Sequence, residues 1–467
     1  MPLVESFSGI RGIYDDGLDE EVAVRYAYSY LHFLKKTNNK NLKIVIGMDT
    51  RPSGRIIKNA LLEVLDCDIV DIGIAPTPIT EFAVRRCKAD GGIIITASHN
   101  EPYWNGFKFL DKNGAVLSPE DMNTIIKFYS KLKHIKNADF SSKHLNNNKN
   151  FKKIKERKIE QKNKEMEKEY SNFVLGFLSK NDKEKIRKAK FRIIIDPNGG
   201  TGIIAKDILE SLGAEVKGIN MEIGIFNRII EPNKDSLIYL GNYLRDGNYN
   251  FDAGFDCDAD RVEIMTSKGL VSGNHLLALI ADDILKKSSK KIIVVNNATS
   301  NAVKETAIKN HSKYIETEVG EVNVVSEMYR LKAPIGGEGS SSGVIISPSR
   351  CRDGILTLVY LLKILACSNK KLDELINELP EFYNIKAKVS FNPKKHQLIK
   401  NKIKKYYGKK GRISETKDSI KIVFKNSFIW FRASKTEANI LRIISDAAKK
   451  EAAEALISEA VKLIKTK

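Results

Sequence analysis

Short apolar runs that end in turn-forming residues recur along most of the chain, and helical patterns separate them. The runs lie at 43–54, 69–78, 91–96, 191–202, 251–265 and 291–300. Strands that alternate with helices form parallel or mixed sheets. The pattern therefore predicts three successive α/β domains, for which we expect the boundaries 1–145, 165–288 and 289–380.

The C-terminal part shows a different order of elements. Strand-like segments at 386–391, 419–424 and 439–447 come before a helix from 447 to 465. Consecutive strands without intervening helices are typical of an α+β arrangement. The expected fold is therefore three α/β domains with mixed sheets followed by a small α+β C-terminal domain at 385–467.

The segment 143–168 interleaves lysine with glutamate and contains no glycine or proline, which predicts a solvated helix. The chain carries a formal net charge of +20, which would suit a nucleic-acid partner. A helix that binds a nucleic-acid backbone would use more aromatic and arginine side chains than the one Phe and one Arg of this segment. We expect no nucleic-acid partner; a salt-sensitive mobility shift would reveal that alternative.

The longest apolar stretch, at 356–367, contains Lys363 and is too short to cross a bilayer, so it predicts a buried helix. Residues 1–12 show neither a secretory nor a transit-peptide pattern. Five widely spaced cysteines without a C-x-x-C pair indicate neither a disulfide framework nor a zinc site. We expect a cytoplasmic protein, a monomer or a homodimer, without a membrane partner.

A serine follows the apolar run G-G-I-I-I-T at 91–96, which is short, rich in isoleucine and typical of a buried strand. Ser98 would then lie in a loop at the carboxyl end of the strand, the edge of an α/β sheet where ligands bind. The alternative is that Ser98 caps a following helix, which on composition alone is the more common role.

Three carboxylates at every second position follow the strand pattern at 251–255: Asp256, Asp258 and Asp260. An EF-hand loop would need a glycine and a twelfth-position glutamate, where this chain has Arg261 and Ser267. Three oxygens in one turn, with room for an outside phosphate oxygen, suit Mg²⁺. A solvated acidic turn is the alternative.

Two later segments carry polar side chains after apolar residues. G-G-E-G-S-S-S-G at 336–343 contains a carboxylate and hydroxyls that could partner sugar hydroxyls, although Gly/Ser runs are usually flexible loops. R-A-S-K-T-E-A-N at 432–439 groups an arginine fork, hydroxyls and a lysine, which suits a phosphate. Such a cluster is a surface turn as often as an anion site.

In their order and spacing, these four segments resemble the loops of the α-D-phosphohexomutases. That family has a serine loop T-A-S-H-N-P followed by N-G-F/I-K, a metal loop D-G-D-x-D-R, a sugar loop G-E-x-S and a phosphate loop R-P-S-G-T-E-P. The resemblance extends to G-I-R-G at 9–12, D-T-R-P-S-G at 49–54 and A-P-T-P at 75–78, and so covers essentially the whole chain. It implies four domains around a central cleft.

The resemblance also implies a role for each matching residue. Ser98 would carry a phosphoryl group and exchange it with a hexose phosphate. Asp256, Asp258 and Asp260 would hold Mg²⁺ together with Ser98. Lys108, Arg11 and Arg261 would surround the phosphoryl group. His99 or Lys108 would move the hydroxyl proton. The choice between His99 and Lys108 stays open.

The sugar loop would bind sugar hydroxyls through Glu338 and Ser340. The phosphate loop would hold the phosphate that is not being transferred, through Arg432, Ser434, Lys435 and Thr436. The chain departs from the family pattern at five positions: Phe7 for threonine, Glu101 for proline, Cys257 for glycine, Lys435 for glycine and Ala438 for proline. Its sugar loop also lacks the histidine that many relatives have.

The implied activity is an intramolecular phosphotransfer that interconverts hexose 6-phosphate and hexose 1-phosphate through a phosphoserine and a 1,6-bisphosphate. The wording G-G-E-G-x-x-x-G-V-I, with R-D-G at 352–354, favours a phosphoglucosamine mutase. The alternatives are a phosphomannomutase or phosphoglucomutase, and a non-catalytic relative that binds sugar phosphates.

Overall fold

The computed structural model describes residues 3–6, 9–37, 41–132, 157–434 and 439–465. Two compact units make up the chain. The first consists of Met1–Val271 and Ile345–Leu372, and the second of Ser272–Val344 and Asp373–Lys467.

The first sheet of unit 1 is mixed. Its strands, in spatial order, are β1 (Val4–Ser6), β2 (Gly9–Tyr14), β7 (Trp104–Leu110), β6 (Gly91–Ile95), β4 (Lys43–Met48), β5 (Asp68–Ile74) and β8 (Ile159–Gln161), with β3 (Gly17–Leu18) paired to β2. The pairs among β4, β5, β6 and β8 are parallel, whereas β6–β7, β2–β7 and β1–β2 are antiparallel.

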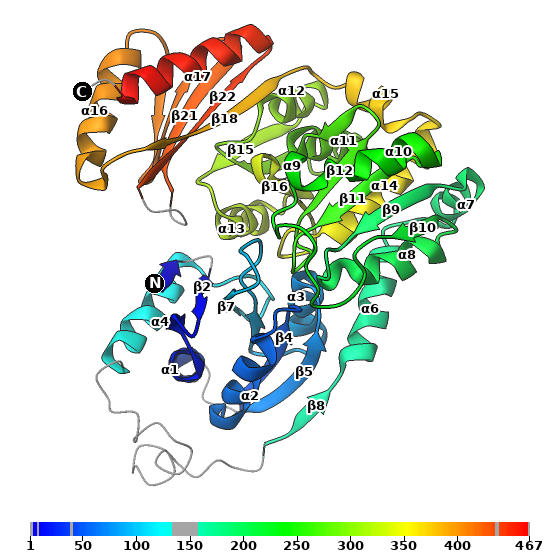
Figure 1. Ribbon diagram of the computed structural model, residues 1–467, viewed down its shortest axis with the longest axis vertical. Helices are drawn as coiled ribbons and strands as arrows, with labels where there is room; N and C mark the ends of the chain where they lie inside the picture. Colours follow the sequence, from blue (N-terminus) through cyan, green and yellow to red (C-terminus); the bar gives the residue numbers. More distant parts are fainter. Residues whose placement is uncertain (1–2, 7–8, 38–40, 133–156, 435–438, 466–467) are drawn as a thin grey trace. The chain divides into compact units, whose positions relative to one another are not determined.

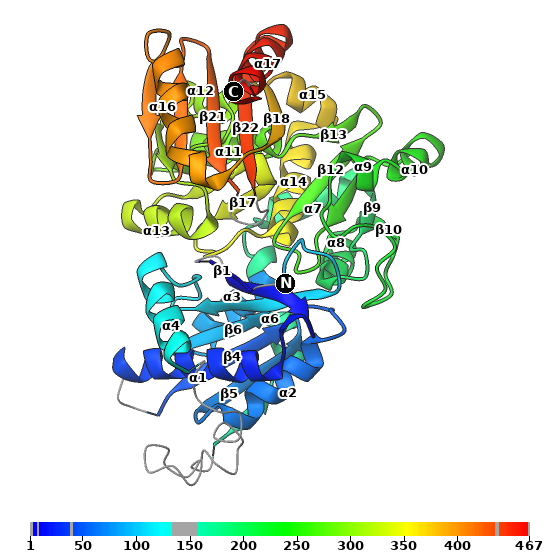
Figure 2. The same ribbon diagram turned by 60° about the vertical axis from the view of Figure 1, so that its left-hand side comes forward.

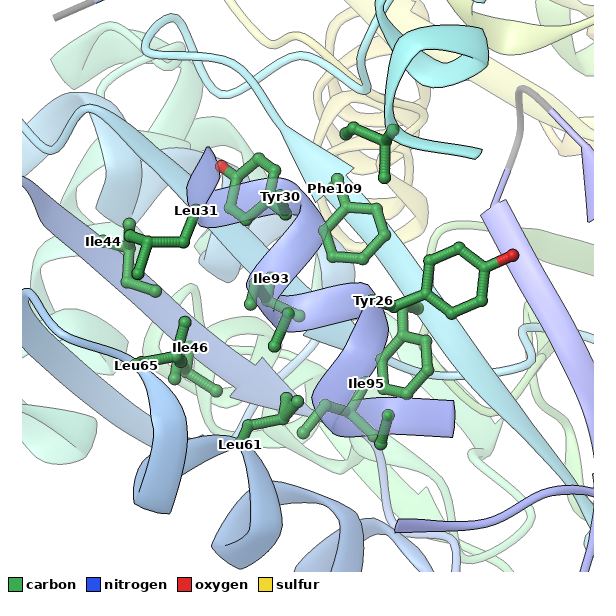
Figure 3. Close-up of a cluster of buried hydrophobic side chains, with 14 of the residues drawn as sticks. Tyr26, Tyr30, Leu31, Ile44, Ile46, Leu61, Leu65, Ile93, Ile95 and Phe109 are labelled. Carbon is green, nitrogen blue, oxygen red and sulfur yellow. The ribbon is translucent and has the colours of Figure 1, made fainter. Parts of the chain in front are cut away.

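Helices cover both faces of this sheet, which is why its central strands are apolar at successive positions. On one face α1 (Glu20–Thr37), α2 (Gly54–Val64) and α4 (Pro119–Leu132) pack against alternate strand residues, including Ile44, Ile46, Ile93 and Ile95. Figure 3 shows tyrosines and leucines of the helices meeting these isoleucines and Phe109. On the other face, α3 (Thr77–Arg86) packs against β4 and β6 (Figure 1).

The second sheet of unit 1 is also mixed. Its order is β10 (Glu215–Gly218), β9 (Arg192–Asp196), β11 (Phe251–Phe255), β12 (Val262–Thr266) and β13 (Gly269–Val271). The helices α8 (Ala205–Ser211), α9 (Lys234–Leu237) and α10 (Leu240–Gly247) pack against this sheet, and the short 3₁₀ helix η2 (Thr201–Ile204) precedes α8. The helix α6 (Asn163–Leu175) packs against α3 and β5 instead, and α7 (Lys180–Ala189) packs against a later helix of unit 1.

The apolar segment at 356–367 forms α14 (Gly354–Ser368), a buried helix as predicted. It packs against α6, α7 and β12, all in unit 1. Asp353 caps α14 by accepting the N–H of Leu356 at 2.9 Å, and its carboxylate also accepts the hydroxyl of Tyr170 of α6 at 2.7 and 2.8 Å. No helix in the described ranges is long and apolar enough to cross a membrane.

The predicted solvated helix at 143–168 is confirmed at 163–168, which belong to α6, and is wrong at 157–162. Residues 143–156 lie outside the described residues. Residues Ile159–Gln161 form β8, which pairs in parallel with β5, and α6 begins only at Asn163. Residues 159–161 are a strand because their backbone groups form hydrogen bonds with β5. The distribution of charges in the sequence does not indicate that this pairing exists.

Unit 2 contains one α/β layer and one antiparallel sheet (Figure 2). The third sheet has the order β15 (Lys313–Thr317), β14 (Ile292–Asn296), β16 (Ile335–Glu338) and β17 (Gly343–Ile346), with helices α11 (Gly273–Lys287), α12 (Asn301–Lys309) and α13 (Glu321–Leu331). The short 3₁₀ helix η3 (Gly339–Ser341) follows β16, and α15 (Leu372–Asn377) precedes the fourth sheet.

The fourth sheet confirms the α+β prediction for the C-terminal part. Its order is β18 (Tyr383–Ser390), β22 (Ile440–Ala447), β21 (Ser427–Ala433), β20 (Ser419–Val423) and β19 (Arg412–Glu415), and every pair is antiparallel. Two helices, α16 (His396–Tyr407) and α17 (Lys450–Lys465), share one apolar core with the sheet. The short 3₁₀ helix η4 (Pro393–Lys395) precedes α16.

Candidate functional site

The serine loop, residues 96–103, connects β6 to β7. Ser98 is completely buried, and its φ of +52° lies in the left-handed region that non-glycine residues adopt rarely. Its backbone N–H donates to the hydroxyl of Thr96 at 2.8 Å. A strand rather than a helix follows the loop, so the capping interpretation of Ser98 is wrong, and the strand-to-loop prediction is confirmed.

The metal loop, residues 256–261, begins where β11 ends. Asp256, Asp258 and Asp260 are completely buried, and one ligand oxygen from each lies within 4.8 Å of the others. Oδ1 of Asp258 and Oδ1 of Asp260 accept no hydrogen bond from any described residue. Buried carboxylate oxygens without donors are what a hard cation requires, so this set fits a divalent metal ion and is not a solvated turn.

The serine loop and the metal loop meet inside unit 1. The hydroxyl of Ser98 donates to Oδ2 of Asp256 at 3.4 Å, although the two residues are 158 positions apart. Thr77, at the start of α3, donates through its hydroxyl to Oδ2 of Asp258 at 2.7 Å. The backbone N–H of Thr77 donates to the carbonyl of Asp258 at 3.0 Å. The first sheet therefore supplies both the serine and an anchor for the metal loop.

The three aspartates differ in their electrostatics. Burial, and next the charges of Asp260 and Asp258, raise the pKa of Asp256 well above its ordinary value. Burial also opposes ionisation of Asp260, but the charges of Arg352, Lys108 and Arg261 outweigh it and lower its pKa. A divalent cation among the three carboxylates would relieve the repulsion that affects Asp256.

Cationic side chains predicted from the sequence surround the carboxylates. Nζ of Lys108, on β7, lies 2.7 Å from Oδ2 of Asp258 and 3.2 Å from Oδ2 of Asp260. Nε of Arg261 lies 3.8 Å from Oδ2 of Asp256 and 3.6 Å from Oδ1 of Asp260. These positive charges therefore lie against the carboxylates of the metal loop.

Arg11 and His99 complete the predicted set in unit 1. Arg11, on β2, donates to Oδ1 of Asn100 in the serine loop at 2.8 Å. Burial, and next the charge of Arg261, lower the pKa of Arg11 to about 10, so it remains a cation at neutral pH. Nδ1 of His99 is buried and makes no hydrogen bond to a described residue. Burial, and next the charge of Arg261, lower the pKa of His99 well below its ordinary value.

Sequence reasoning missed two residues of this cluster. Nη2 of Arg352 donates to Oδ2 of Asp260 at 2.7 Å, from a segment 92 positions further along the chain. The sequence signal for Arg352 is the R-D-G at 352–354, which by itself indicates only a sugar preference. Thr77 belongs to the A-P-T-P motif at 75–78, which matches the family pattern but indicates no role. Neither residue lies near the metal loop in sequence, so only the fold brings them there.

Two departures from the family pattern have a visible structural consequence. Cys257 has an ordinary negative φ, and the positive φ of the metal loop falls at Ala259, at +53°. Sγ of Cys257 lies 3.5 Å from the hydroxyl of Thr50. Glu101 accepts the backbone N–H of Ile230 through Oε1 at 3.3 Å, a contact that proline could not make.

The sugar loop, residues 336–343, lies in unit 2. Glu338 ends β16 and is almost fully buried, and its Oε1 accepts Nδ2 of Asn296 at 3.0 Å and the N–H of Gly320 at 2.9 Å. Ser340 lies in η3, and its carbonyl accepts Nζ of Lys386 at 2.6 Å. The carboxylate of Glu338 is thus fixed by a side chain and by the start of α13.

The phosphate loop, residues 432–439, begins with the last two residues of β21 in the same unit. Nε of Arg432 lies 3.9 Å from Oε1 of Glu318 and makes no hydrogen bond to a described residue. Burial lowers the pKa of Arg432, and the charges of Glu318, Asp418 and Glu338 oppose that shift. The N–H of Ser434 donates to the carbonyl of Ile440 at 2.7 Å. Lys435 and Thr436 lie outside the described residues, as do Phe7 and Ala438.

The predicted residues thus form two groups. In unit 1 the structure brings together Ser98, His99, Lys108, Arg11, Asp256, Asp258, Asp260 and Arg261. Unit 2 holds Glu338, Ser340, Arg432 and Ser434, and the charge of Glu338 acts on Arg432.

Comparisons with known proteins agree with this geometry. Family models described as the α/β/α domains I, II and III of phosphoglucomutase/phosphomannomutase match residues 5–136, 168–269 and 272–383. A phosphoglucomutase/phosphomannomutase of Thermococcus kodakarensis is 32% identical over 98% of this chain and 97% of its own length. A phosphoglucosamine/phosphogalactosamine mutase of Sulfurisphaera tokodaii is 30% identical, with 98% of each chain covered.

Solved structures share the fold. A phosphoglucomutase/phosphomannomutase family protein of Burkholderia thailandensis has a TM-score of 0.82 at 21% identity, covering 99% of this chain and 97% of that one. An N-acetylphosphoglucosamine mutase of Aspergillus fumigatus, solved with GlcNAc-6P and magnesium, has a TM-score of 0.61 at 14% identity, covering 98% and 95%.

The resemblance inferred from the four loops is therefore confirmed. The three family models together match well over half of the chain, and the curated relatives match it over nearly its whole length. The chain belongs to the phosphoglucomutase/phosphomannomutase family of phosphohexomutases, which are isomerases.

Proposed function

We propose that this protein interconverts hexose 6-phosphate and hexose 1-phosphate through a phosphorylated Ser98 and a 1,6-bisphosphate. One observation carries the proposal: the hydroxyl of a buried, conformationally constrained serine lies 3.4 Å from a carboxylate of the metal-type aspartate cluster. Lys108, Arg261 and Arg11 add positive charge around it, and such charge stabilises a phosphoryl group during transfer.

The phosphoryl group moves in two half-reactions. First, the free hydroxyl oxygen of a bound hexose phosphate forms a bond to the phosphorus on Ser98, while the bond from phosphorus to Oγ breaks. His99 or Lys108 takes the proton of the sugar hydroxyl and gives a proton to the departing Ser98 oxygen, which ends as a hydroxyl. The bisphosphate then reverses its orientation, and its other phosphoryl group returns to Ser98, so no phosphate is consumed.

We assign the cation to Mg²⁺, held by Asp256, Asp258 and Asp260 with an oxygen on phosphorylated Ser98. All these donors are hard oxygens, which Mg²⁺ prefers when it also binds phosphate. The Aspergillus fumigatus neighbour was solved with magnesium, which supports the same assignment here. When bound, the ion would supply positive charge against the phosphoryl oxygens.

The residues of unit 2 would hold the remainder of the substrate. We assign the sugar hydroxyls to Glu338 and Ser340, and the phosphate that is not being transferred to Arg432, Ser434, Lys435 and Thr436. Glu338 is oriented by Asn296 and Gly320, which supports a fixed acceptor for hydroxyl groups.

A mass and activity comparison of two serine variants tests the proposal. Ser98→Ala should abolish turnover and should also remove one phosphate's mass from the intact protein. The matched control is Ser29→Ala, because Ser29 is equally buried but bonds only within α1, to the carbonyl of Arg25. Mutase activity in Ser98→Ala at the level of the control would overturn the proposal.

We favour glucosamine phosphate as the substrate, with glucose and mannose phosphates as alternatives. The sugar-loop wording supports this choice, as do relatives named phosphoglucosamine mutase. A coupled assay with the three sugar 1-phosphates at equal concentration would decide, through the ratio of their kcat/KM values. A higher kcat/KM for mannose 1-phosphate would contradict the choice.

The second candidate is a relative that binds sugar phosphates without catalysis, which the substituted loop positions favour. Binding of a hexose phosphate by calorimetry, without turnover or phosphoserine, would support it. For location we propose the cytoplasm, because none of the five cysteines, all of which lie in the described ranges, forms a disulfide.

A further inference from the structure

The guanidinium of Arg51 holds the serine loop by its backbone. Nη2 donates to the carbonyls of Ser98 and Asn100 at 2.7 and 2.6 Å. Nη1 donates to the carbonyls of Glu101 and Trp104 at 2.5 and 2.9 Å. These four carbonyls span the whole turn between β6 and β7.

Asp49 fixes the guanidinium in turn. Nε of Arg51 donates to Oδ2 of Asp49 at 2.9 Å, and both side chains are completely buried. With this bond all five N–H donors of the guanidinium are used. Oδ2 of Asp49 also accepts the hydroxyl of Thr96 at 2.6 Å, and that hydroxyl accepts the N–H of Ser98.

Both peptide groups that flank the Cα of Ser98 are therefore bound to one buried ion pair. The Ser98 N–H reaches Asp49 through Thr96, and the Ser98 carbonyl bonds to Arg51. Two fixed peptide planes determine the φ and ψ between them, and the φ of Ser98 is an unfavourable +52°. Without the two anchors, the chain would relax toward an ordinary φ and carry the hydroxyl away from Asp256.

We infer that Arg51, with Asp49 and Thr96, is a positioning residue for the serine that carries the phosphoryl group, and this rests on the proposed function. Every N–H of its guanidinium is bound to Asp49 or to a carbonyl of the serine loop or β7, which leaves none for a substrate. Arg51 acts by presenting Oγ of Ser98 to the metal-type cluster, and it also fixes Asn100, whose side chain accepts Arg11. A group misplaced by about 1 Å can cost a phosphotransferase roughly a hundredfold in rate.

The test compares Arg51→Lys with Arg55→Lys. A lysine has three donors and no fork, so it cannot bind Asp49 and four carbonyls together. Arg55 lies on α2 four positions further along and is exposed, which makes Arg55→Lys the matched control. We expect Arg51→Lys to lower kcat and the rate of Ser98 phosphorylation by 1,6-bisphosphate at least about tenfold. The KM and the affinity for Mg²⁺ should stay within about threefold, and Arg55→Lys should match wild type.

A purely structural role would give a different result. Arg51→Lys would then unfold at a lower temperature but keep the wild-type kcat wherever it is fully folded, and this outcome would overturn the inference. If Arg51→Lys does not fold by circular dichroism, Thr96→Val decides, since it keeps the side-chain shape while removing the link from Asp49 to the Ser98 N–H. A wild-type kcat in Thr96→Val would likewise overturn it.

A separate measurement distinguishes failure of the proposed function. If the wild-type protein shows neither mutase activity nor phosphate on Ser98, the proposed function fails. Hydrogen exchange alone then tests whether Arg51 holds the serine loop in place. Amides at 97–104 should exchange faster in Arg51→Lys than in Arg55→Lys. Equal exchange in the two variants would overturn the inference.

Discussion

At the scale of single residues, burial decides what a polar side chain does. Asp256, Asp258 and Asp260 are as buried as Asp252, four positions before the metal loop on β11. The three site aspartates lie among cations, and one oxygen of each lies within 4.8 Å of the others. Both oxygens of Asp252 instead lack any hydrogen bond to a described residue, and its partners on the two adjacent strands are Ile194 and Met265.

Asp252 should make the stability of the protein depend on pH. Burial raises its pKa from 3.8 to about 8. Between those values the folded state holds one proton more than the unfolded state, so stability should fall as pH rises through this window, by up to about 1.4 kcal/mol per pH unit. Urea unfolding at pH 5, 6, 7 and 8 should show this fall, and Asp252→Asn should remove it.

Asp196, in the same unit as Asp252, provides a control for this prediction. Asp196, on β9, is equally buried but accepts Nε of Arg228 at 2.6 Å. Asp196→Asn should therefore destabilise the protein, by about 3 kcal/mol, because it removes the negative charge that pairs with the buried guanidinium of Arg228. An unchanged pH slope in Asp252→Asn would show that the carboxyl is ionised in the folded protein.

Cys257 should be dispensable for the metal. Its Sγ lies next to the hydroxyl of Thr50, its φ is ordinary, and a hard cation has little affinity for sulfur. Cys257→Gly should leave Mg²⁺ affinity within about threefold by calorimetry, while a buried contact is lost and stability falls by about 1 kcal/mol. Asp258→Asn is the positive control and should abolish binding. Displacement of the ion by a thiol reagent would contradict the assignment.

At the scale of elements, each loop of the site begins where a strand ends. The serine loop follows β6, the metal loop follows β11 and the phosphate loop follows β21. These placements were predictable because an apolar run followed by glycine, serine or aspartate is a local signal. The strand β8 was not predictable, since its charged sequence becomes a strand only through pairing with β5.

Arg432, near the end of β21, should bind the phosphate that is not being transferred. Arg432 has no hydrogen bond from Nε to a described residue and faces Glu318 at 3.9 Å, so it can turn to a phosphate. Arg432→Ala should lower kcat/KM at least about tenfold without changing the phosphorylation of Ser98, because binding at the far end of the substrate orients it. The control is Arg412→Ala, an exposed arginine on β19 of the same sheet. Wild-type kinetics in Arg432→Ala would remove the loop from the substrate site.

At the scale of the whole molecule, the three aspartates that we propose as metal ligands lie in unit 1, as do Lys108, Arg261 and Arg352, which pair with them. The chain of unit 1 is discontinuous, because Ile345–Leu372 returns to it and brings Arg352 to Asp260. The two units should therefore respond differently to the metal ion.

Hydrogen exchange with and without Mg²⁺ measures that difference. Peptides covering 96–110 and 252–262 should be protected at saturating Mg²⁺, by about 2.7 kcal/mol at a hundred times the Kd when they exchange by global unfolding. Peptides from the fourth sheet should change less. Asp258→Asn should abolish the effect. Equal protection of β21 and β22 would mean that the ion stabilises both units together.

The sequence by itself determined the kind of each domain, the strand ends that carry polar loops and the family resemblance, because each depends on a short run of neighbouring residues. The tertiary structure alone decided which loops meet. Ser98 and Asp256 are 158 positions apart, Thr77 and Asp258 are 181 apart, and their contacts depend on how sheets and helices pack. It also decided the left-handed φ of Ser98, which two distant anchors impose against the preference of serine itself.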